Sequence, residues 1–215
     1  MCDSPNRIRH SQWDQDKLKV PFVIRQPNEK DIPKGDSTYN SWKERLEIEL
    51  VEGFVFAENQ DQKDQKFDFY AEININNPRI WELSKRLLEN ITGESYIVYN
   101  LHDEEIQYGS RLDISEIIQK LDIIETDIIN NCSISLGIVQ DTIDLKEVFI
   151  DESKYLKYWG SDETFFRQIM DEFGLKEYDE MKFVDQYPKI VYDWSFVNKE
   201  GRTNEELVDF LETEL

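Results

Sequence analysis

The chain has 215 residues and carries 46 Asp and Glu against 25 Lys and Arg, a formal net charge of −21. With 39% hydrophobic and 13% aromatic residues it can build a core, which excludes the composition typical of a disordered protein. The 2 cysteines exclude a disulfide framework, and the sequence has neither an apolar run of about 18 residues nor the apolar region of a signal peptide. We therefore expect a protein of the reducing cytoplasm.

The first 41 residues differ from the rest in composition. They hold four of the 6 prolines, and only residues 20–24 form a short apolar run. This pattern predicts an extended, partly disordered N-terminal arm over residues 1–41, with room for one edge strand. Residues 42–215 are expected to form a single acidic α+β domain. Residues 1–45 contain 7 acidic and 9 basic side chains, so the remainder carries −23.

Alternation of apolar and polar residues predicts strands that come in neighbouring pairs. Leu46, Ile48 and Leu50 alternate with Glu47 and Glu49, and similar patterns recur along the chain. A period of two indicates half-buried strands. The predicted pairs are 46–56 with 67–75, 96–101 with 105–112, and 134–138 with 143–150, followed by a strand-like segment over 189–196.

Apolar residues at helical spacing predict helices between and after these pairs. Pro78 begins one helix that Gly93 ends, and Thr203 with Glu206 forms a capping box for the last one. The other two helices are expected to begin at Asp113 or Ser115, and at Ser161 with Gly174 as the stop. The resulting prediction is an α+β fold with a mainly antiparallel sheet, built from strand-strand-helix units, with helices packed on one face.

Acidic side chains are expected on the outward face of the first hairpin. Glu47, Glu49, Glu52, Asp68 and Glu72 would lie side by side there. Like charges on adjacent strands repel each other unless something positive binds them. The face is therefore interpreted either as a recognition surface for a cationic partner or as a solvated face whose charges discourage aggregation.

Aromatic residues next to acids form a second candidate feature. Tyr and Trp are typical anchors of protein interfaces, and acids beside them suit the Arg and Lys of a basic partner. The same aromatic residues are also ordinary strand residues under a helix. The candidate partner-binding residues are Glu47, Glu49, Asp68, Glu72, Tyr155, Tyr158, Trp159, Asp179, Glu180 and Asp185.

The sequence gives less support for a catalytic or metal-binding site than for a partner-binding surface. Residues 102–105 read as a polar turn, and the acidic pair Asp162–Glu163 is explained by helix capping. The sequence contains no Gly-x-Ser-x-Gly, phosphate-binding loop, HExxH or CxxC motif. We expect no catalytic residues, no metal and no cofactor. Direct binding of nucleic acid is not expected either, because the acidic body repels phosphate. Nothing in the sequence indicates a membrane partner.

In charge, size and texture, residues 46–215 resemble the immunity proteins of bacterial polymorphic-toxin systems, with acidic-aromatic stretches around Tyr155–Trp159 and Tyr178–Tyr192. The resemblance implies a small, cytoplasmic, acidic α+β protein that binds a cognate toxin domain and blocks it. It carries no motif, so no functional residue follows from it. The expected function is an acidic protein that inhibits or neutralises a basic protein partner. The alternatives are a DNA-mimic antagonist of a nucleic-acid-binding protein, an enzyme with a carboxylate-based site, and a structural or regulatory domain.

Overall fold

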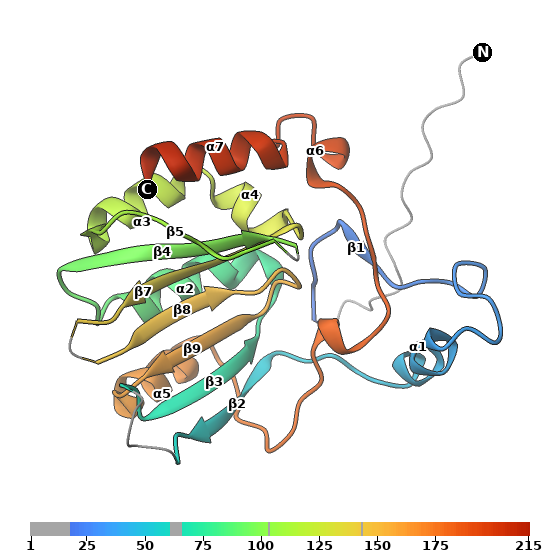
Figure 1. The fold of residues 1–215 in the computed structure, drawn as a ribbon. Helices are drawn as coiled ribbons and strands as arrows, with labels where there is room; N and C mark the ends of the chain where they lie inside the picture. Colours follow the sequence, from blue (N-terminus) through green and yellow to red (C-terminus); the bar gives the residue numbers. More distant parts are fainter. Residues whose placement is uncertain (1–17, 61–65, 103, 143) are drawn as a thin grey trace.

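A single antiparallel sheet organises the fold in the computed structural model, which describes residues 18–60, 66–102, 104–142 and 144–215 (Figure 1). Within these residues the sheet has 8 strands. Along the sheet they are β2 (Gly53–Glu58), β3 (Phe69–Asn74), β9 (Leu156–Gly160), β8 (Lys146–Ile150), β7 (Ile134–Gln140), β4 (Glu94–Leu101) and β5 (Gln107–Tyr108), and β6 (Leu112–Asp113) also pairs with β4.

The three predicted strand pairs are present as hairpins. β2 pairs with β3, β7 with β8, and β4 with the short β5, all antiparallel. β9 lies between β3 and β8, with Tyr70 opposite Trp159 and Trp159 opposite Glu147. This strand joins the first hairpin to the third, so the hairpins form one continuous sheet.

Helices cover one face of this sheet, which confirms the predicted α+β class. In Figure 1, α2 (Ile80–Leu88) and α5 (Glu163–Glu172) lie behind the strands, and α7 (Asn204–Glu214) lies above β4. The other helices near β4 and β7 are α3 (Ile114–Asp122) and α4 (Glu125–Asn130). A short 3₁₀ turn, η1 (Asn77–Arg79), precedes α2 and contains the predicted N-terminal proline.

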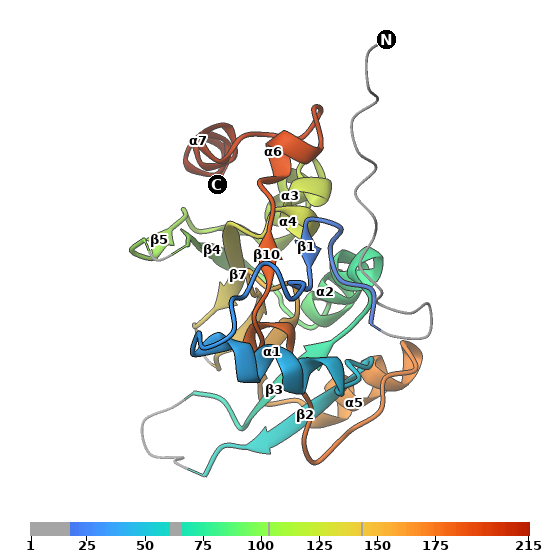
Figure 2. The ribbon, with the colours of Figure 1, turned by 90° about the vertical axis from the view of Figure 1, so that its right-hand side faces the viewer.

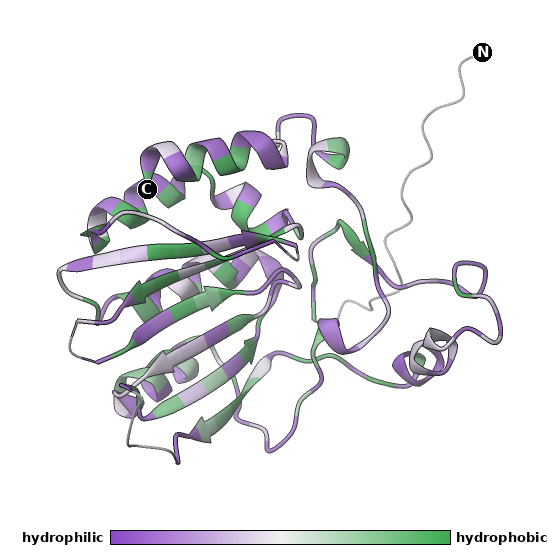
Figure 3. Cartoon of the chain, in the orientation of Figure 1, coloured by the Kyte–Doolittle hydropathy of each residue, from purple (hydrophilic) through white to green (hydrophobic). Residues whose placement is uncertain are grey.

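The main core lies between the helices and the covered face of the sheet. Phe69, Ala71 and Ile73 of β3 point into it, as do Tyr158 of β9 and Phe166 of α5. The intervening residues of the same strands are more exposed. Figure 3 shows the resulting alternation of hydrophobic and hydrophilic residues along the strands. Burial of one strand face explains why period-two alternation predicted these strands.

A second, smaller core lies at one end of the strands (Figure 2). There β1 (Ile24–Arg25) pairs with β10 (Ile190–Val191). The cluster joins distant parts of the chain and consists of Leu18, Val23, Ile24, Leu50, Cys132, Val184 and Trp194. Trp194 begins the short α6 (Trp194–Val197). Part of the segment predicted as an extended arm therefore packs on the domain.

The helix α1 (Thr38–Leu46) crosses the expected domain boundary between residues 41 and 42. Its C-terminal end occupies the start of the first predicted strand, and β2 begins only at Gly53. The prediction of a strand from residue 46 was therefore wrong over 46–52. Residues 1–17 of the predicted arm lie outside the described residues.

The helix starts agree with the predictions except at α5. Asp162 caps α5 by accepting a hydrogen bond from the Phe165 backbone N–H at 2.9 Å, in place of the predicted Ser161. Asp113 caps α3 by accepting from Ser115 N–H. The capping box of Thr203 and Glu206 on α7 is confirmed.

Candidate functional site: the open face of the sheet

The face of the sheet that no helix covers is turned toward the viewer in Figure 1. Most of its side chains are half-buried, because no helix packs on them. Tyr70, Trp159, Glu147, Val139 and Tyr96 are successive partners across β3, β9, β8, β7 and β4. We call this surface the open face and define it by Tyr70, Glu72, Tyr96, Val98, Glu147, Phe149, Lys157 and Trp159.

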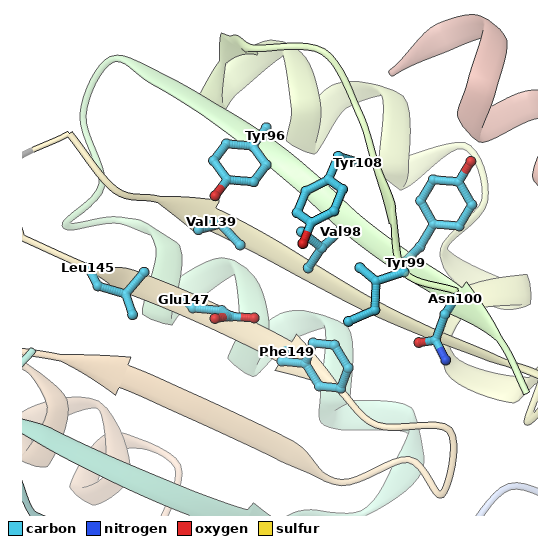
Figure 4. A pocket seen from close by; sticks show the side chains of 10 residues that line it. Tyr96, Val98, Tyr99, Asn100, Tyr108, Val139, Leu145, Glu147 and Phe149 are labelled. Atoms are coloured by element: carbon cyan, nitrogen blue, oxygen red, sulfur yellow. The ribbon is translucent and has the colours of Figure 1, made fainter. Parts of the chain in front are cut away.

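One end of the open face is hollowed into a cavity of about 280 Å³ (Figure 4). Its walls include the rings of Tyr96, Tyr108 and Phe149, and the side chains of Ile106 and Glu147. Ile106 and Tyr108 belong to the edge around β5 and are 57% and 69% exposed. The cavity thus combines aromatic walls, an exposed apolar rim and one carboxyl group.

Gly137 of β7 makes room for the side chains around this cavity. A Cβ atom at this position would lie 2.7 Å from Val98 Cγ2, 2.9 Å from Phe149 Cδ2 and 3.0 Å from Glu147 Oε1. Real Cβ atoms do not approach other atoms this closely. The absence of a side chain at Gly137 therefore allows the side chains of Glu147 and Phe149 to lie across β7.

The carboxyl of Glu147 has no hydrogen-bond or ion-pair partner among the described residues. Burial raises its pKa to about 7, and burial is the sole cause of that shift. The nearby phenol of Tyr96 also has a raised pKa, mainly through burial, then through Asp141, with a smaller contribution from Glu147. Desolvation without a compensating charge favours the protonated acid.

Beside the cavity, Arg111 and Asp141 form an ion pair that does not include Glu147. Arg111 Nη2 lies 2.8 Å from Asp141 Oδ1, and its guanidinium lies 4.8 Å from the centre of the Tyr96 ring. The Tyr96 hydroxyl donates to Asp141 Oδ2 at 3.3 Å. The pKa of Asp141 is lowered by its hydrogen bond to Arg111. Arg111 is thereby held by Asp141 and Tyr96 at the side of the cavity.

The other end of the open face is formed by Tyr70 and Trp159. Their ring centres lie 4.8 Å apart, and both line a shallow hollow of about 430 Å³ with Ala57 and Phe67. The Tyr70 hydroxyl donates to Glu72 Oε1 at 2.7 Å. Burial, followed by this hydrogen bond, raises the pKa of Tyr70. Trp159 therefore connects the two hollows, since it lies between Tyr70 and Glu147 in the cross-strand row.

Only some of the predicted aromatic residues lie on a surface. Tyr158 is completely buried and stacks on Phe166 with ring centres 5.3 Å apart. Tyr155 is 4% exposed, packs on Phe183, and donates from its hydroxyl to Asp185 at 3.2 Å. The expectation of one surface patch made by Tyr155, Tyr158 and Trp159 is therefore corrected. Tyr158 alternates with Trp159 along β9 and so points to the core, whereas Tyr155 precedes β9 and is covered by Phe183, so only Trp159 of the three belongs to the open face.

The predicted acidic residues are also dispersed. Glu47 and Glu49 lie between α1 and β2 and are exposed, and Asp68 precedes β3. Only Glu72 of the four lies within a strand on the open face. Asp179, Glu180 and Asp185 are exposed in the segment between α5 and β10. Their role in partner binding stays a prediction.

The acidic pair considered for catalysis, Asp162–Glu163, has structural roles. Asp162 caps α5, and Glu163 forms an ion pair with Arg167 at 2.6 Å. Glu172 pairs with Arg86 at 2.6 Å, and His102 is exposed at the end of β4. Among the described residues, no group of three His, Cys, Asp or Glu side chains is arranged to hold a metal ion. Nor does any helix in the described ranges have the length and apolarity to cross a membrane.

Sequence reasoning missed Glu147, Phe149, Tyr96 and Tyr108 as a group. The alternation of residues 146–150 places Glu147 and Phe149 on the face away from the core, and this signal was available. The cavity itself needs Gly137 and Tyr96 from two other strands. No local pattern brings these residues together.

Comparisons of the chain with protein-family models, with curated proteins and with solved structures gave no match.

Proposed function

We propose that this chain is an acidic binding protein that inhibits or neutralises a basic protein partner, as immunity proteins do. The open face of the sheet is the proposed contact surface. The observation that carries the proposal is the half-buried, aromatic open face with an unpaired carboxyl, on a chain with a net charge of −21.

The chemistry of the open face supports a protein partner. Tyr and Trp side chains contribute much contact area at interfaces for a small loss of conformational freedom. Tyr70, Tyr96 and Trp159 lie on one continuous row, and Tyr108 is exposed at its edge. Lone exposed apolar residues are common on protein surfaces, but a connected set on the face of a sheet that no helix covers favours an interface.

The negative net charge would attract a basic partner before the two proteins come into contact. An acidic field attracts a basic surface over distances comparable to the Debye length and raises the association rate. A DNA mimic would need carboxylates in a regular stripe, whereas Glu72 and Glu147 are the only two carboxylates among the eight residues that define the open face. The open face therefore favours an inhibitor over a DNA mimic.

A site-specific crosslinking experiment tests the contact surface. The full chain is made with a photo-crosslinking amino acid at Tyr108, which is 69% exposed beside the open face, or at Phe196 of α6, which is 85% exposed. We expect the Tyr108 position to crosslink a basic protein in the source cells and the Phe196 position to fail. Equal crosslinking from both positions, or an acidic partner, would contradict the proposal.

Surface plasmon resonance with the identified partner then tests the steering. Raising the salt from 0.01 to 0.1 M shortens the Debye length from about 30 Å to about 10 Å. We expect the association rate to fall roughly tenfold or more, and the dissociation rate to change little. Neutralising Glu47, Glu49, Asp68 and Glu72 together should also slow association. An association rate that salt does not change would overturn the electrostatic part, and undiminished activity of the bound partner would overturn inhibition.

A further inference from the structure

Glu147 differs from three buried or half-buried carboxyls that are held by a cation, namely Asp127, Asp151 and Glu52. Asp127 is 3% exposed and forms an ion pair with Arg202 at 2.6 Å. Asp151 pairs with Lys157 at 2.9 Å, and Glu52 with Arg79 at 3.0 Å. Glu147 has no such counter-charge among the described residues. Removing a carboxylate from water without a partner is unfavourable, so such a group indicates a site where a ligand could supply the counter-charge.

The neighbouring cations are already engaged elsewhere. Lys157, on the adjacent strand, bonds Asp151, and Arg111 bonds Asp141. Lys146 precedes Glu147 in β8, but its Nζ donates to the Asn90 carbonyl oxygen at 2.6 Å. A counter-charge for Glu147 would therefore have to enter from outside through the cavity.

The cavity has the size and lining to admit one long cationic side chain. A water molecule occupies about 30 Å³ in the liquid, so 280 Å³ is room for far more than a single water. Phe149, Tyr96 and Tyr108 present aromatic rings, and Val98, Ile106 and Leu145 present apolar surface. Aromatic faces attract cations, and apolar walls suit the methylene stem of Arg or Lys.

Arginine fits this lining better than lysine. The guanidinium is planar, stacks on aromatic rings, and is less strongly hydrated than an ammonium group. It also binds a carboxylate with two parallel hydrogen bonds. We propose that the cavity is a receptor for one arginine side chain of the basic partner, with Glu147 as the residue that determines specificity. This inference rests on the proposed function and names the group recognised.

A small-molecule experiment tests the cavity without the partner. The full chain, labelled with ¹⁵N and ¹³C, is titrated with Nα-acetyl-arginine amide at millimolar concentrations and observed by NMR. We expect saturable shifts at Glu147, Phe149 and Tyr96. Nα-acetyl-citrulline amide, which has nearly the same shape without the charge, should bind roughly tenfold more weakly or worse. Nα-acetyl-lysine amide should also bind more weakly.

Variants of the chain supply the controls. Glu147→Gln should weaken the arginine probe roughly tenfold, and Tyr108→Ala, which removes an exposed ring, should weaken it severalfold. Glu125→Gln changes a half-buried carboxyl at the start of α4, outside the open face, and should leave binding within about twofold. The amide spectrum of each variant shows whether it is folded.

Each outcome separates this inference from the proposed function. Equal binding of the arginine and citrulline probes, or no effect of Glu147→Gln, would overturn the receptor role of Glu147. Equal binding of the lysine probe would overturn the preference for arginine. Either result leaves the crosslinking and salt experiments to decide the proposed function. Conversely, if the arginine probe binds saturably but crosslinking finds no basic partner, the arginine site would be supported and the proposed function would be overturned.

Discussion

The two faces of the sheet are built from alternate residues of the same strands, but one face is buried under helices and the other is only half-buried. On the covered face, Phe69, Ala71 and Ile73 of β3 are at most 2% exposed and pack under α5 and its Phe166. On the open face, Tyr70 and Glu72 of that strand stay half-buried and contact mainly their neighbours in the sheet. Packing explains the covered face completely. It does not explain why the open face carries a carboxyl whose burial is unfavourable, so this residue points to function.

The largest expected effect comes from the covered face. Phe166→Ala should lower the free energy of unfolding by about 3–5 kcal/mol, because it leaves a cavity in the main core. The Phe166 ring is fully buried and lies 5.2–5.4 Å from those of Phe69, Tyr158 and Phe54. Urea denaturation measures the change. Phe196→Ala, at an exposed ring, is the matched control and should change stability by less than about 0.5 kcal/mol. A similar cost for both would refute the assigned core.

An intermediate effect is expected from Glu147 and depends on pH. Its folded pKa of about 7 exceeds the ordinary value of 4.5, so the folded state holds the proton more tightly than the unfolded state. Stability from this group is fully present below pH 4.5, falls as pH rises, and is lost above pH 7. Since one pKa unit corresponds to about 1.4 kcal/mol, the loss is on the order of 3 kcal/mol.

Denaturation of wild type and Glu147→Gln between pH 4.5 and 8 measures this effect. The variant should lack the decline that the wild type shows, and should therefore be relatively more stable at pH 8 than at pH 5. Phe196→Ala, which changes no titratable group, should follow the wild-type curve. Parallel curves for wild type and Glu147→Gln would show that the carboxyl is solvated or paired.

The smallest effect on stability is expected at Trp159, although its effect on binding should be large. Trp159→Ala removes a half-buried ring that packs against Tyr70 and leaves the main core intact. We expect a loss of about 1 kcal/mol in the free energy of unfolding, together with a dissociation rate from the partner raised roughly tenfold or more. A stability loss as large as that of Phe166→Ala would make the open face structural and remove the contrast between the faces.

Local patterns were sufficient for the hairpins, the main helices and the fold class. They were insufficient at residues 46–50, where a five-residue alternation coincides with the end of α1 and the connection to β2. They also did not predict that β9 inserts between β3 and β8, because Tyr70 and Trp159 are far apart in the sequence. Alternation gives the face of each strand but not its neighbours.

The candidate site was predictable only in part, for the same reason. Trp159 was selected as an aromatic next to acids, and the structure places it on the open face. Tyr158, selected with it, points to the opposite face and is buried. The alternation in β8 predicts which face Glu147 lies on. Its burial beside a cavity depends on Gly137, Tyr96 and Tyr108, which belong to other strands. Burial of a charge is a tertiary property and cannot be read from one segment.

The second core has a consequence for the order in which the protein opens. Among the residues that the structure describes, it contains seven that are buried, and β1 and β10 join Ile24 to Val191 through a two-residue ladder. Segments with few buried contacts detach at a lower free energy than the whole molecule unfolds. We therefore expect the second core to open as a separate cooperative unit. Its amides should exchange with solvent while β3, β9 and β8 stay paired, so that fluctuations which release the chain around β1 leave the open face intact.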